Sequence, residues 1–470
     1  MHTIALPSKR EVRLRGDAGH RALSVESSRV IVRPPLPPGP FLVVGLARSG
    51  VAAALALRAR GGEVVACDAA PVSDETRAEL AAAGVPVHAP TEAVELVPGA
   101  STVVKSPGVP HQAAVVAAAR REGLRVIGEL EIGWRLLANE FIAVTGSNGK
   151  TTTAEWIGHV HRTANAEVVV AGNVGTALTT LPGVLAADAV VVCEASSFQL
   201  EDTEAFAPEA AVLLNLAEDH LDRHGSFDAY RAAKLRVFAA QPPAAIAVAP
   251  SDLVTDVVGE AERITFGRGG DLEHRDGRLY WRRHLLMEAS EIRLRGAHNR
   301  ENAMATAAVC LARGVPHAAV REGLATFTGV PHRMEEITSV DGVLYVNDSK
   351  ATNVASAVVA IESFPARTVH AILGGSAKRS DYTPLAQPLA AHAKAAYLIG
   401  ETAGEIRDAI ATAGVKVVES GDLEHAVAAA RADAREGDVV LLSPACASYD
   451  QYRSFEERGE HFKALVNAGG

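Results

Sequence analysis

Residues 141–153 carry the pattern most suited to chemistry, FIAVTGSNGKTTT. The apolar first residues predict a buried strand, and the residues after Lys150 predict a helix. Gly146 and Gly149 allow the loop to turn its backbone N–H groups toward an anion at the helix N-terminus. Lys150 supplies a positive charge for terminal phosphates, and Thr151 supplies a hydroxyl for Mg²⁺. Position 144 is valine where the general P-loop has its first glycine, so the pattern matches a shortened phosphate loop.

Three further β-rich runs end in polar residues: VVVAGNVG, AVVVCEASSFQLE and AAVLLNLAEDHLDRHG. The ends of such strands collect at one edge of a parallel α/β sheet, beside the phosphate loop. Asn173, Glu194 and His220 are therefore expected to face Mg-ATP, and the Glu194 carboxylate is a ligand type that Mg²⁺ prefers. His220 and His224 are four residues apart, but the glutamate of the zinc-protease helix is missing between them. Zinc is therefore not expected.

Two more small-residue loops follow strands nearer the N-terminus. FLVVGLARSG begins at residue 41, and the next strand, EVVACD, ends at Asp68. The spacing between this loop and Asp68 is near the roughly 20 residues expected before a ribose-binding acid, although Ala47 replaces the middle glycine. Ser106-Pro107-Gly108 follow a third strand. The pattern favours a doubly wound domain with a ligand at its strand ends, and two purely structural turns stay open as the alternative.

The chain after residue 330 alternates strands and helices again and predicts another parallel sheet. Cationic and hydroxyl residues follow its strands, which suits a small carboxylate substrate. Arg333 comes directly after the glycine and proline of FTGVPHR, where an arginine can reach a phosphate across a cleft. A strand is also expected to end at Gly296, before a helix from residue 302.

The composition is that of a globular protein with a large core. The chain has 470 residues, 48% hydrophobic and 22% charged. A formal charge of −10 argues against a general nucleic-acid binder, and no apolar run reaches the about 18 residues of a spanning helix. Cys67, Cys193, Cys310 and Cys446 lack metal-ligand spacing and are expected to be reduced thiols of a cytoplasmic protein.

The organisation predicted from these runs is α/β with three domains after a leader. Residues 1–40 are polar, basic and then proline-rich, and are expected to be disordered. Residues 41–130 are predicted to bind a nucleotide-linked substrate, residues 131–329 to bind ATP, and residues 330–470 to bind a small acid.

These motifs together resemble the Mur ligase family of ATP-dependent peptide-forming enzymes. TGSNGKTT, the HN of GAHN, PHRME and NDSKATN carry the family resemblance, and ASSFQLE, NLAEDHLDRHG, YRAAK and SPACASYDQYRSFEERG are similar to its D-glutamate-adding members. The resemblance covers residues 41–462. It implies a Rossmann-like N-terminal domain, a P-loop ATPase-like central domain with a mostly parallel sheet, and a Rossmann-like C-terminal domain. It also implies a monomer that joins D-glutamate to UDP-N-acetylmuramoyl-L-alanine for peptidoglycan synthesis, using ATP and Mg²⁺.

The resemblance assigns residues to each ligand. The UDP-linked substrate would contact Leu46, Ala47, Arg48, Ser49, Asp68, Ser106, Pro107, Gly108, Asn173, Ser196 and Gln199. ATP would contact Gly146, Ser147, Asn148, Gly149, Lys150, Thr151, Thr152, Asn299, Arg333 and Asp348. Lys150 would act in catalysis with Glu194, His220 and Lys234, and Mg²⁺ would be organised by Thr151, Glu194, His220 and a carbamylated Lys234. D-Glutamate would contact Lys350, Thr352, Lys378, Ser448 and Phe455.

Three positions depart from the family pattern, and other functions stay open. Ala47 replaces a glycine, GGSAKRSD lacks an aspartate and glycine before its lysine, and Tyr449 stands where an apolar residue is usual. The alternatives are another Mur-type amino-acid ligase, a nucleotide-binding regulatory module without ligase chemistry, and a nicotinamide-dependent oxidoreductase. The last rests only on the first glycine loop.

Overall fold

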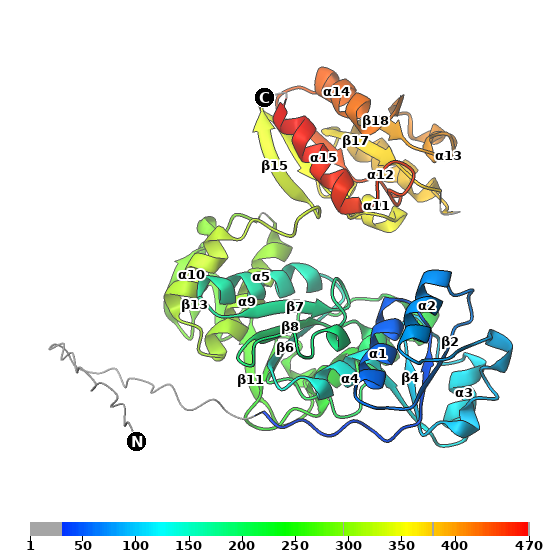
Figure 1. The fold of residues 1–470 in the computed structure, drawn as a ribbon. Coiled ribbons are helices and arrows are strands. Elements are labelled where there is room, and N and C mark those ends of the chain that lie inside the picture. Colours follow the sequence, from blue (N-terminus) through cyan, green and yellow to red (C-terminus); the bar gives the residue numbers. More distant parts are fainter. Residues whose placement is uncertain (1–30, 295, 378–379, 469–470) are drawn as a thin grey trace, which may run out of the picture.

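The computed structural model describes residues 31–294, 296–377 and 380–468. Sheets of five, nine and six strands follow one another along this part of the chain, each with its own helices (Figure 1). The prediction of an α/β protein with three domains is therefore confirmed. The domain boundaries proposed from the sequence stay a prediction.

The N-terminal sheet is parallel and has the order β3–β2–β1–β4–β5. Because β2 and β3 lie on one side of β1 and β4 and β5 on the other, the loops after β1 and β4 open side by side. The strands are β1 (Phe41–Val44), β2 (Val64–Cys67), β3 (Val87–His88), β4 (Thr102–Lys105) and β5 (Arg125–Gly128). The helices are α1 (Arg48–Ala59), α2 (Asp74–Ala82), α3 (Ala114–Arg121) and α4 (Glu129–Leu136).

The central sheet has the order β14–β13–β12–β11–β10–β9–β6–β8–β7, in which β6 to β12 are parallel and β12, β13 and β14 pair antiparallel. The parallel strands are β6 (Glu140–Thr145), β7 (Val168–Gly172), β8 (Val190–Glu194), β9 (Ala210–Leu213), β10 (Ile246–Pro250), β11 (Glu262–Phe266) and β12 (Leu272–Arg275). The other two are β13 (Arg278–Trp281) and β14 (His284–Glu288).

Helices cover both faces of this sheet, because its strands are apolar on both sides. Ile142 and Val144 of β6 face a core that includes α5 (Lys150–Thr163), α9 (Ala297–Ala312) and α10 (His317–Thr326). Phe141 and Ala143 point the other way and share a core with α4 and α8 (Phe227–Ala239). The short helices α6 (Ser197–Leu200) and α7 (Leu221–His224) follow β8 and β9.

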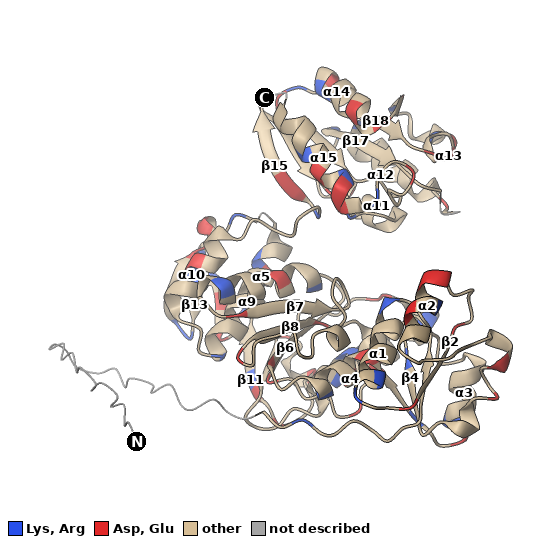
Figure 2. Cartoon of the chain, viewed as in Figure 1, with Lys and Arg blue, Asp and Glu red and all other residues tan. Residues whose placement is uncertain are grey.

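The C-terminal sheet has the order β15–β16–β20–β17–β18–β19, in which only β15 is antiparallel to its neighbour. Its strands are β15 (Glu335–Val340), β16 (Val343–Asn347), β17 (Val369–Gly374), β18 (Ala393–Ile399), β19 (Lys416–Gly421) and β20 (Val439–Leu442). Its helices are α11 (Val354–Glu362), α12 (Ala386–His392), α13 (Ala403–Ala409), α14 (Leu423–Asp433) and α15 (Phe455–Ala468). Acidic residues occupy the first turns of α2 and α15, where they complement the helix dipole (Figure 2).

The end of the predicted leader is packed against the domains, which corrects the expectation of disorder up to residue 40. Arg33 pairs with Glu209 of the central domain, with Nη1 2.8 Å from Oε1 and Nη2 3.1 Å from Oε2. Its guanidinium also lies 4.7 Å from the centroid of the Trp134 ring. The carbonyl of Pro38 accepts a 2.8 Å hydrogen bond from Thr102 of β4. Residues 1–30 lie outside the described residues.

Two other features differ from the sequence prediction or extend it. The prediction of a strand that ends at Gly296 is wrong, because β14 ends at Glu288 and a single 3₁₀ turn, Ala289–Glu291, follows it. The strands β13 and β14, which pair antiparallel, extend the predicted parallel sheet. Among the described residues, no helix is both long and apolar enough to cross a membrane.

Candidate active site

The phosphate loop between β6 and α5 needs its two glycines. Gly146 has φ of 154° and Gly149 has φ of 82°, and the second is a left-handed conformation that favours glycine. A Cβ atom on Gly149 would lie 2.4 Å from Oδ1 of Asn302, a buried residue of α9. Lys150 folds back over the loop and donates to the carbonyls of Gly146 and Ser147, both at 2.9 Å. Glycine geometry and the lysine contacts therefore fix the shape of the loop.

Side chains after β9 and on α8 hold the phosphate loop from outside. Ser147 Oγ lies 2.9 Å from the hydroxyl of Tyr230 and donates to the carbonyl of Ala217 at 3.0 Å. The backbone N–H of Asn148 donates to Oδ1 of Asn215 at 2.9 Å. The sequence did not single out Asn215 or Tyr230, although both lie in motifs that carry the family resemblance.

Glu194 ends β8 beside the loop and is only 2% exposed. Nδ2 of Asn173 donates to its Oε1 at 2.9 Å, so the structure brings these two predicted residues into contact. Thr151, in the first turn of α5, is also buried. Burial lowers the pKa of the Lys150 amine, Glu194 opposes this shift, and Arg333 adds to it. The two cations and Glu194 therefore act on one another electrostatically across the domains.

Lys234 is buried on α8 and points at the same loop. Its Nζ donates to the carbonyl of Gly146 at 2.7 Å and lies 4.6 Å from the centroid of the Tyr230 ring. Burial, followed by repulsion from Lys150, lowers the pKa of Lys234 from 10.5 to about 7, against the opposing effect of Asp219 and Glu194. Near neutral pH this side chain therefore carries a free, nucleophilic amine far more often than an exposed lysine does.

His220 lies apart from this buried group. It has φ of 52° directly before α7, its side chain is 48% exposed, and its ring lies 4.7 Å from that of Phe198 and pairs with Asp219 at 3.5 Å. The structure therefore places His220 at the rim of the site. Asp219, which sequence reasoning missed, acts on both Lys150 and Lys234.

The C-terminal domain contributes Asp348 and Lys350 after β16. Burial raises the pKa of Asp348 to about 6, although Ser443 and the backbone N–H of Met334 donate hydrogen bonds to its carboxylate. Burial lowers the pKa of Lys350, Arg333 adds to this effect and Glu194 opposes it. Exposed Arg333 therefore lies within electrostatic reach of both lysines, Lys150 and Lys350.

The residues predicted to bind D-glutamate lie on segments that one buried arginine joins. Nε and Nη2 of Arg458, in α15, donate to Oγ and the carbonyl of Ser349 at 3.0 and 2.9 Å. The same guanidinium donates to the carbonyls of Cys446 and Ala447. Lys350 and Thr352 follow Ser349, Ser448 follows Ala447, and Phe455 begins α15. Lys378 lies outside the described residues.

The N-terminal loops predicted to hold the UDP group support each other. Oγ of Ser106 donates to the carbonyl of Gly45 at 2.7 Å, and the Asp68 carboxylate accepts from the backbone N–H of Leu46 and of Ala70. A Cβ on Gly50 would lie 1.8 Å from the carbonyl oxygen of Gly45, so the loop and α1 meet closely there. Arg48 and Gly108 are exposed beside these contacts.

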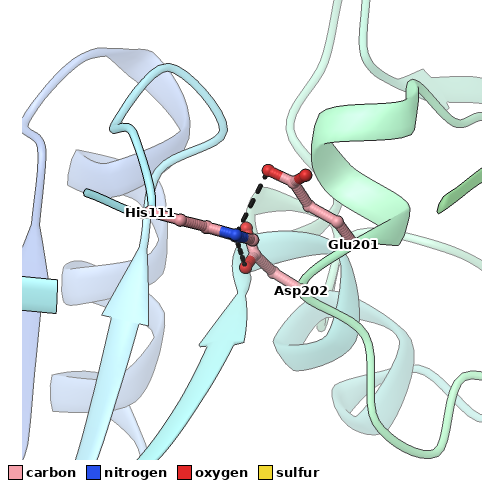
Figure 3. Close-up of side chains that lie close together, drawn as sticks. All are labelled: His111, Glu201 and Asp202. Carbon is pink, nitrogen blue, oxygen red and sulfur yellow. Dashed lines mark hydrogen bonds and ion pairs between the residues drawn. The ribbon is translucent and has the colours of Figure 1, made fainter. Parts of the chain in front are cut away.

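Ser196 and Gln199 form a capping box at the start of α6, with Gln199 Oε1 accepting from the N–H and Oγ of Ser196 at 3.0 Å. Directly after α6, Glu201 and Asp202 meet His111 of the N-terminal domain (Figure 3). Nε2 of His111 lies 3.2 Å from Glu201 Oε1 and 2.9 Å from Asp202 Oδ1.

Asn299 and Asn302 lie one turn apart in α9, and Nδ2 of Asn302 donates to Oδ1 of Asn299 at 3.3 Å. Only Asn299 was predicted from the sequence. The three-residue spacing was the available signal for Asn302, because residues at i and i+3 share a helix face.

Known proteins match nearly the whole chain. The Mur ligase middle domain matches residues 144–310, and the Mur ligase glutamate ligase domain matches residues 332–446. A UDP-N-acetylmuramoylalanine–D-glutamate ligase of Acidobacterium capsulatum is 42% identical over 445 residues, covering 91% of this chain and 96% of its own. The chain belongs to the Mur ligase family. Proteins of the same name from Solibacter usitatus and Symbiobacterium thermophilum are 42% and 41% identical, each covering 91% of this chain and 97% of its own.

Solved Mur ligases share the fold at low sequence identity. The UDP-N-acetylmuramate–alanine ligase of Thermotoga maritima has a TM-score of 0.53 and 19% identity, and covers 92% of this chain and 100% of its own. A MurF ligase of the same organism, solved in complex with ADP, has a TM-score of 0.51 and 20% identity, and covers 79% of this chain and 96% of its own. These likenesses confirm the fold of this Mur ligase.

Proposed function

We propose that the protein joins D-glutamate to UDP-N-acetylmuramoyl-L-alanine, with conversion of ATP to ADP and phosphate, in the synthesis of peptidoglycan precursors. The observation that carries this proposal is the meeting of a glycine phosphate loop, a buried carboxylate and cations from the C-terminal domain. Relatives about 40% identical, with coverage of at least 90% of both chains, are named for this reaction. The four cysteines are free and buried, which supports a cytoplasmic location.

The reaction needs activation, because a carboxylate is a poor electrophile. An oxygen of the alanyl carboxylate attacks the terminal phosphorus of ATP, and ADP leaves with the electrons of the broken P–O bond. The amine of D-glutamate then attacks the acyl carbon, inorganic phosphate leaves, and the amide nitrogen loses a proton. Phosphoryl transfer depends mainly on positioning and charge neutralisation. Lys150 and Arg333 provide positive charge for this step.

The residues beside the phosphate loop fit a magnesium ion. Glu194 offers a buried carboxylate and Thr151 a hydroxyl, which are hard oxygen ligands of the type that Mg²⁺ prefers. When bound, Mg²⁺ neutralises charge on the transferred phosphoryl group. His220, at the rim, would position the ligands from outside the buried group.

We also propose that Lys234 is carbamylated. Its depressed pKa leaves a free amine that can attack CO₂, and the carbamate that forms replaces an ammonium ion by carboxylate-like oxygens. That change suits a residue beside Glu194 and a magnesium site. A Lys234→Ala enzyme should lose activity, and short carboxylates such as acetate should restore part of it. Full activity of this variant without carboxylate would exclude the carbamate.

D-Glutamate and the UDP group of the other substrate would be bound by different domains. Lys350, Thr352, Ser448 and Phe455 would hold D-glutamate, since a cation, hydroxyls and one aromatic ring suit a dicarboxylate with a short apolar stem. The loops at residues 46–49 and 106–108, with Asp68, would hold the UDP group at the N-terminal strand ends. Asn173, Ser196 and Gln199 lie at the ends of β7 and β8, where the sugar and alanyl parts must pass to reach the phosphate loop.

A panel of amino acids in a phosphate-release assay tests the function. With Mg²⁺, ATP and UDP-N-acetylmuramoyl-L-alanine, D-glutamate should support phosphate release and a new amide-linked product, whereas lysine, diaminopimelate and L-glutamate should not. Release with another amino acid would assign a different ligase reaction. Intact ATP with every substrate would refute ligase chemistry.

A further inference from the structure

A buried network of ion pairs joins the loop at residues 106–111 to the central domain. Lys105, the last residue of β4, is fully buried, and its Nζ lies 2.7 Å from Oδ2 of Asp202, which is 1% exposed at the side chain. The same Nζ donates to the carbonyls of Val109 at 2.9 Å and Ser106 at 3.3 Å. One ammonium group therefore binds both the N-terminal loop and the central domain.

Arg223 of α7 makes the reciprocal contact from the central domain. Its Nη2 donates to the carbonyls of Pro107 at 3.2 Å and Val109 at 3.0 Å, and also to Oε1 of Glu201 at 2.9 Å. The guanidinium lies 4.7 Å from the centroid of the Phe198 ring. A backbone bond of 2.8 Å, from the N–H of Gly128 to the carbonyl of Asp202, closes the junction.

The trio of His111, Glu201 and Asp202 has ligand atoms within 4.8 Å of one another, close enough for a metal ion. Their charge is already balanced, because Lys105 lies against Asp202 and Arg223 against Glu201. A buried carboxylate that is paired with a cation has no need of a metal for compensation. The arrangement is therefore that of a junction between domains.

We propose that Lys105, Asp202 and Arg223 are positioning residues, which fix the distance between the UDP end of the substrate and its reacting carboxylate. This inference rests on the proposed function. The network directly adjoins two segments assigned to the substrate, since residues 106–108 precede His111 and α6 precedes Glu201. It also adjoins His220, assigned to catalysis, which directly precedes α7. A substrate held at both ends reacts only if the two ends keep a set separation, and small errors in such geometry cost rate.

The test compares substrate use with UDP binding in the full-length protein. Asp202→Asn removes the buried charge from the central-domain side and leaves the N-terminal contacts Ser106–Gly45 and Asp68–Leu46 in place. We expect at least a tenfold fall in kcat/KM for UDP-N-acetylmuramoyl-L-alanine, a KM for ATP within threefold of wild type, and a Kd for UDP alone within threefold.

Glu204→Gln is the matched control. Glu204 lies two residues from Asp202 and also pairs across the domains, with Nε of Arg125 at 3.0 Å, but both side chains are more than 40% exposed. Loss of the Glu204 charge should leave kcat/KM, the KM for ATP and the Kd for UDP within twofold of wild type, because exposed ion pairs contribute little free energy. Arg223→Lys keeps the charge but loses the planar guanidinium, which lies against the Phe198 ring and places Nη2 within reach of three acceptors, and should raise the KM for the UDP-linked substrate.

Two outcomes would overturn the inference. One is an Asp202→Asn enzyme with wild-type kcat/KM. The other is a fall in UDP affinity as large as the fall in kcat/KM, because the defect would then lie in the N-terminal loop alone. Failure of the proposed function is distinguishable, since the wild-type enzyme itself would then release no phosphate with D-glutamate.

Discussion

Replacing Lys234 by methionine should make the protein more stable while abolishing its activity. The pKa of this amine is about 7 in the folded chain and 10.5 in an exposed lysine. The unfolded chain therefore binds more protons between pH 7 and 10.5, so this group costs stability at neutral pH and the cost fades as pH rises. The difference between these two pKa values corresponds to roughly 4 kcal/mol at pH 7, and relaxation around the charge reduces this cost to roughly 2–4 kcal/mol.

Lys234→Met removes this cost in stability without leaving a buried hydrogen-bond acceptor unsatisfied. The carbonyl of Gly146 loses its bond from Lys234 but keeps the 2.9 Å bond from Lys150. Calorimetric scans in CO₂-free buffer should show the unfolding of the central domain shifted upward by about 5–10 °C at pH 7. The shift should shrink steadily between pH 7 and pH 10. Bicarbonate should raise the unfolding midpoint of the wild type but not that of Lys234→Met, because only the wild type of these two has the Lys234 amine that can form a carbamate.

Lys463→Met provides the control. Lys463 lies 2.7 Å from Glu335 and 3.1 Å from Glu460, and these acids hold the pKa of its amine above the ordinary value. Its loss should lower stability by at most about 1 kcal/mol. The reasoning about Lys234 is refuted if Lys234→Met is no more stable than wild type at pH 7, or if the difference between the two does not change with pH.

Three other changes have defined outcomes. Lys150→Ala should reduce D-glutamate-dependent phosphate release by roughly 100-fold or more, because phosphoryl transfer depends on charge neutralisation; undiminished turnover would remove Lys150 from this role. Gly149→Ala should cost about 1–2 kcal/mol for the left-handed backbone and push against Asn302, so the KM for ATP should rise about tenfold in initial-rate assays. Arg33→Ala should lower stability by about 1–3 kcal/mol in thermal unfolding, with kcat unchanged, because it breaks the pair with Glu209.

The phosphate loop could be predicted from the sequence because its residues carry local signals. A glycine pair, a lysine and a hydroxyl at fixed spacing after an apolar run require only neighbours in the chain to be understood. The polar ends of β7 and β8 were also predictable, since parallel strands bring their ends to one edge. The contact between Asn173 and Glu194 follows from that rule.

The residues that hold the domains together could not be predicted in this way. Lys105 and Asp202 are nearly 100 positions apart in the sequence, and each by itself has the character of a surface residue. Arg458 is likewise buried only because two segments distant from it in the sequence, at Ser349 and at Cys446–Ala447, close around it. The packing of residues 33–40 likewise depends on distant contacts, because Arg33 binds Leu137 and Glu209, which lie more than 100 positions away in the sequence. Such contacts depend on the completed fold.

The two connections between domains differ in a way that suits an enzyme with a long first substrate and a small second one. The first contains the buried pair of Lys105 and Asp202, so relative movement there would expose charges that have lost their partners, at a cost of several kcal/mol. The second passes through residues 329–334, where Gly329, His332 and Met334 have positive φ and Arg333 is exposed. Motion between domains should therefore occur mainly at the second connection. Under the proposed function, the UDP-linked acid would then stay fixed against the phosphate loop, while the C-terminal domain would bring the amine to it.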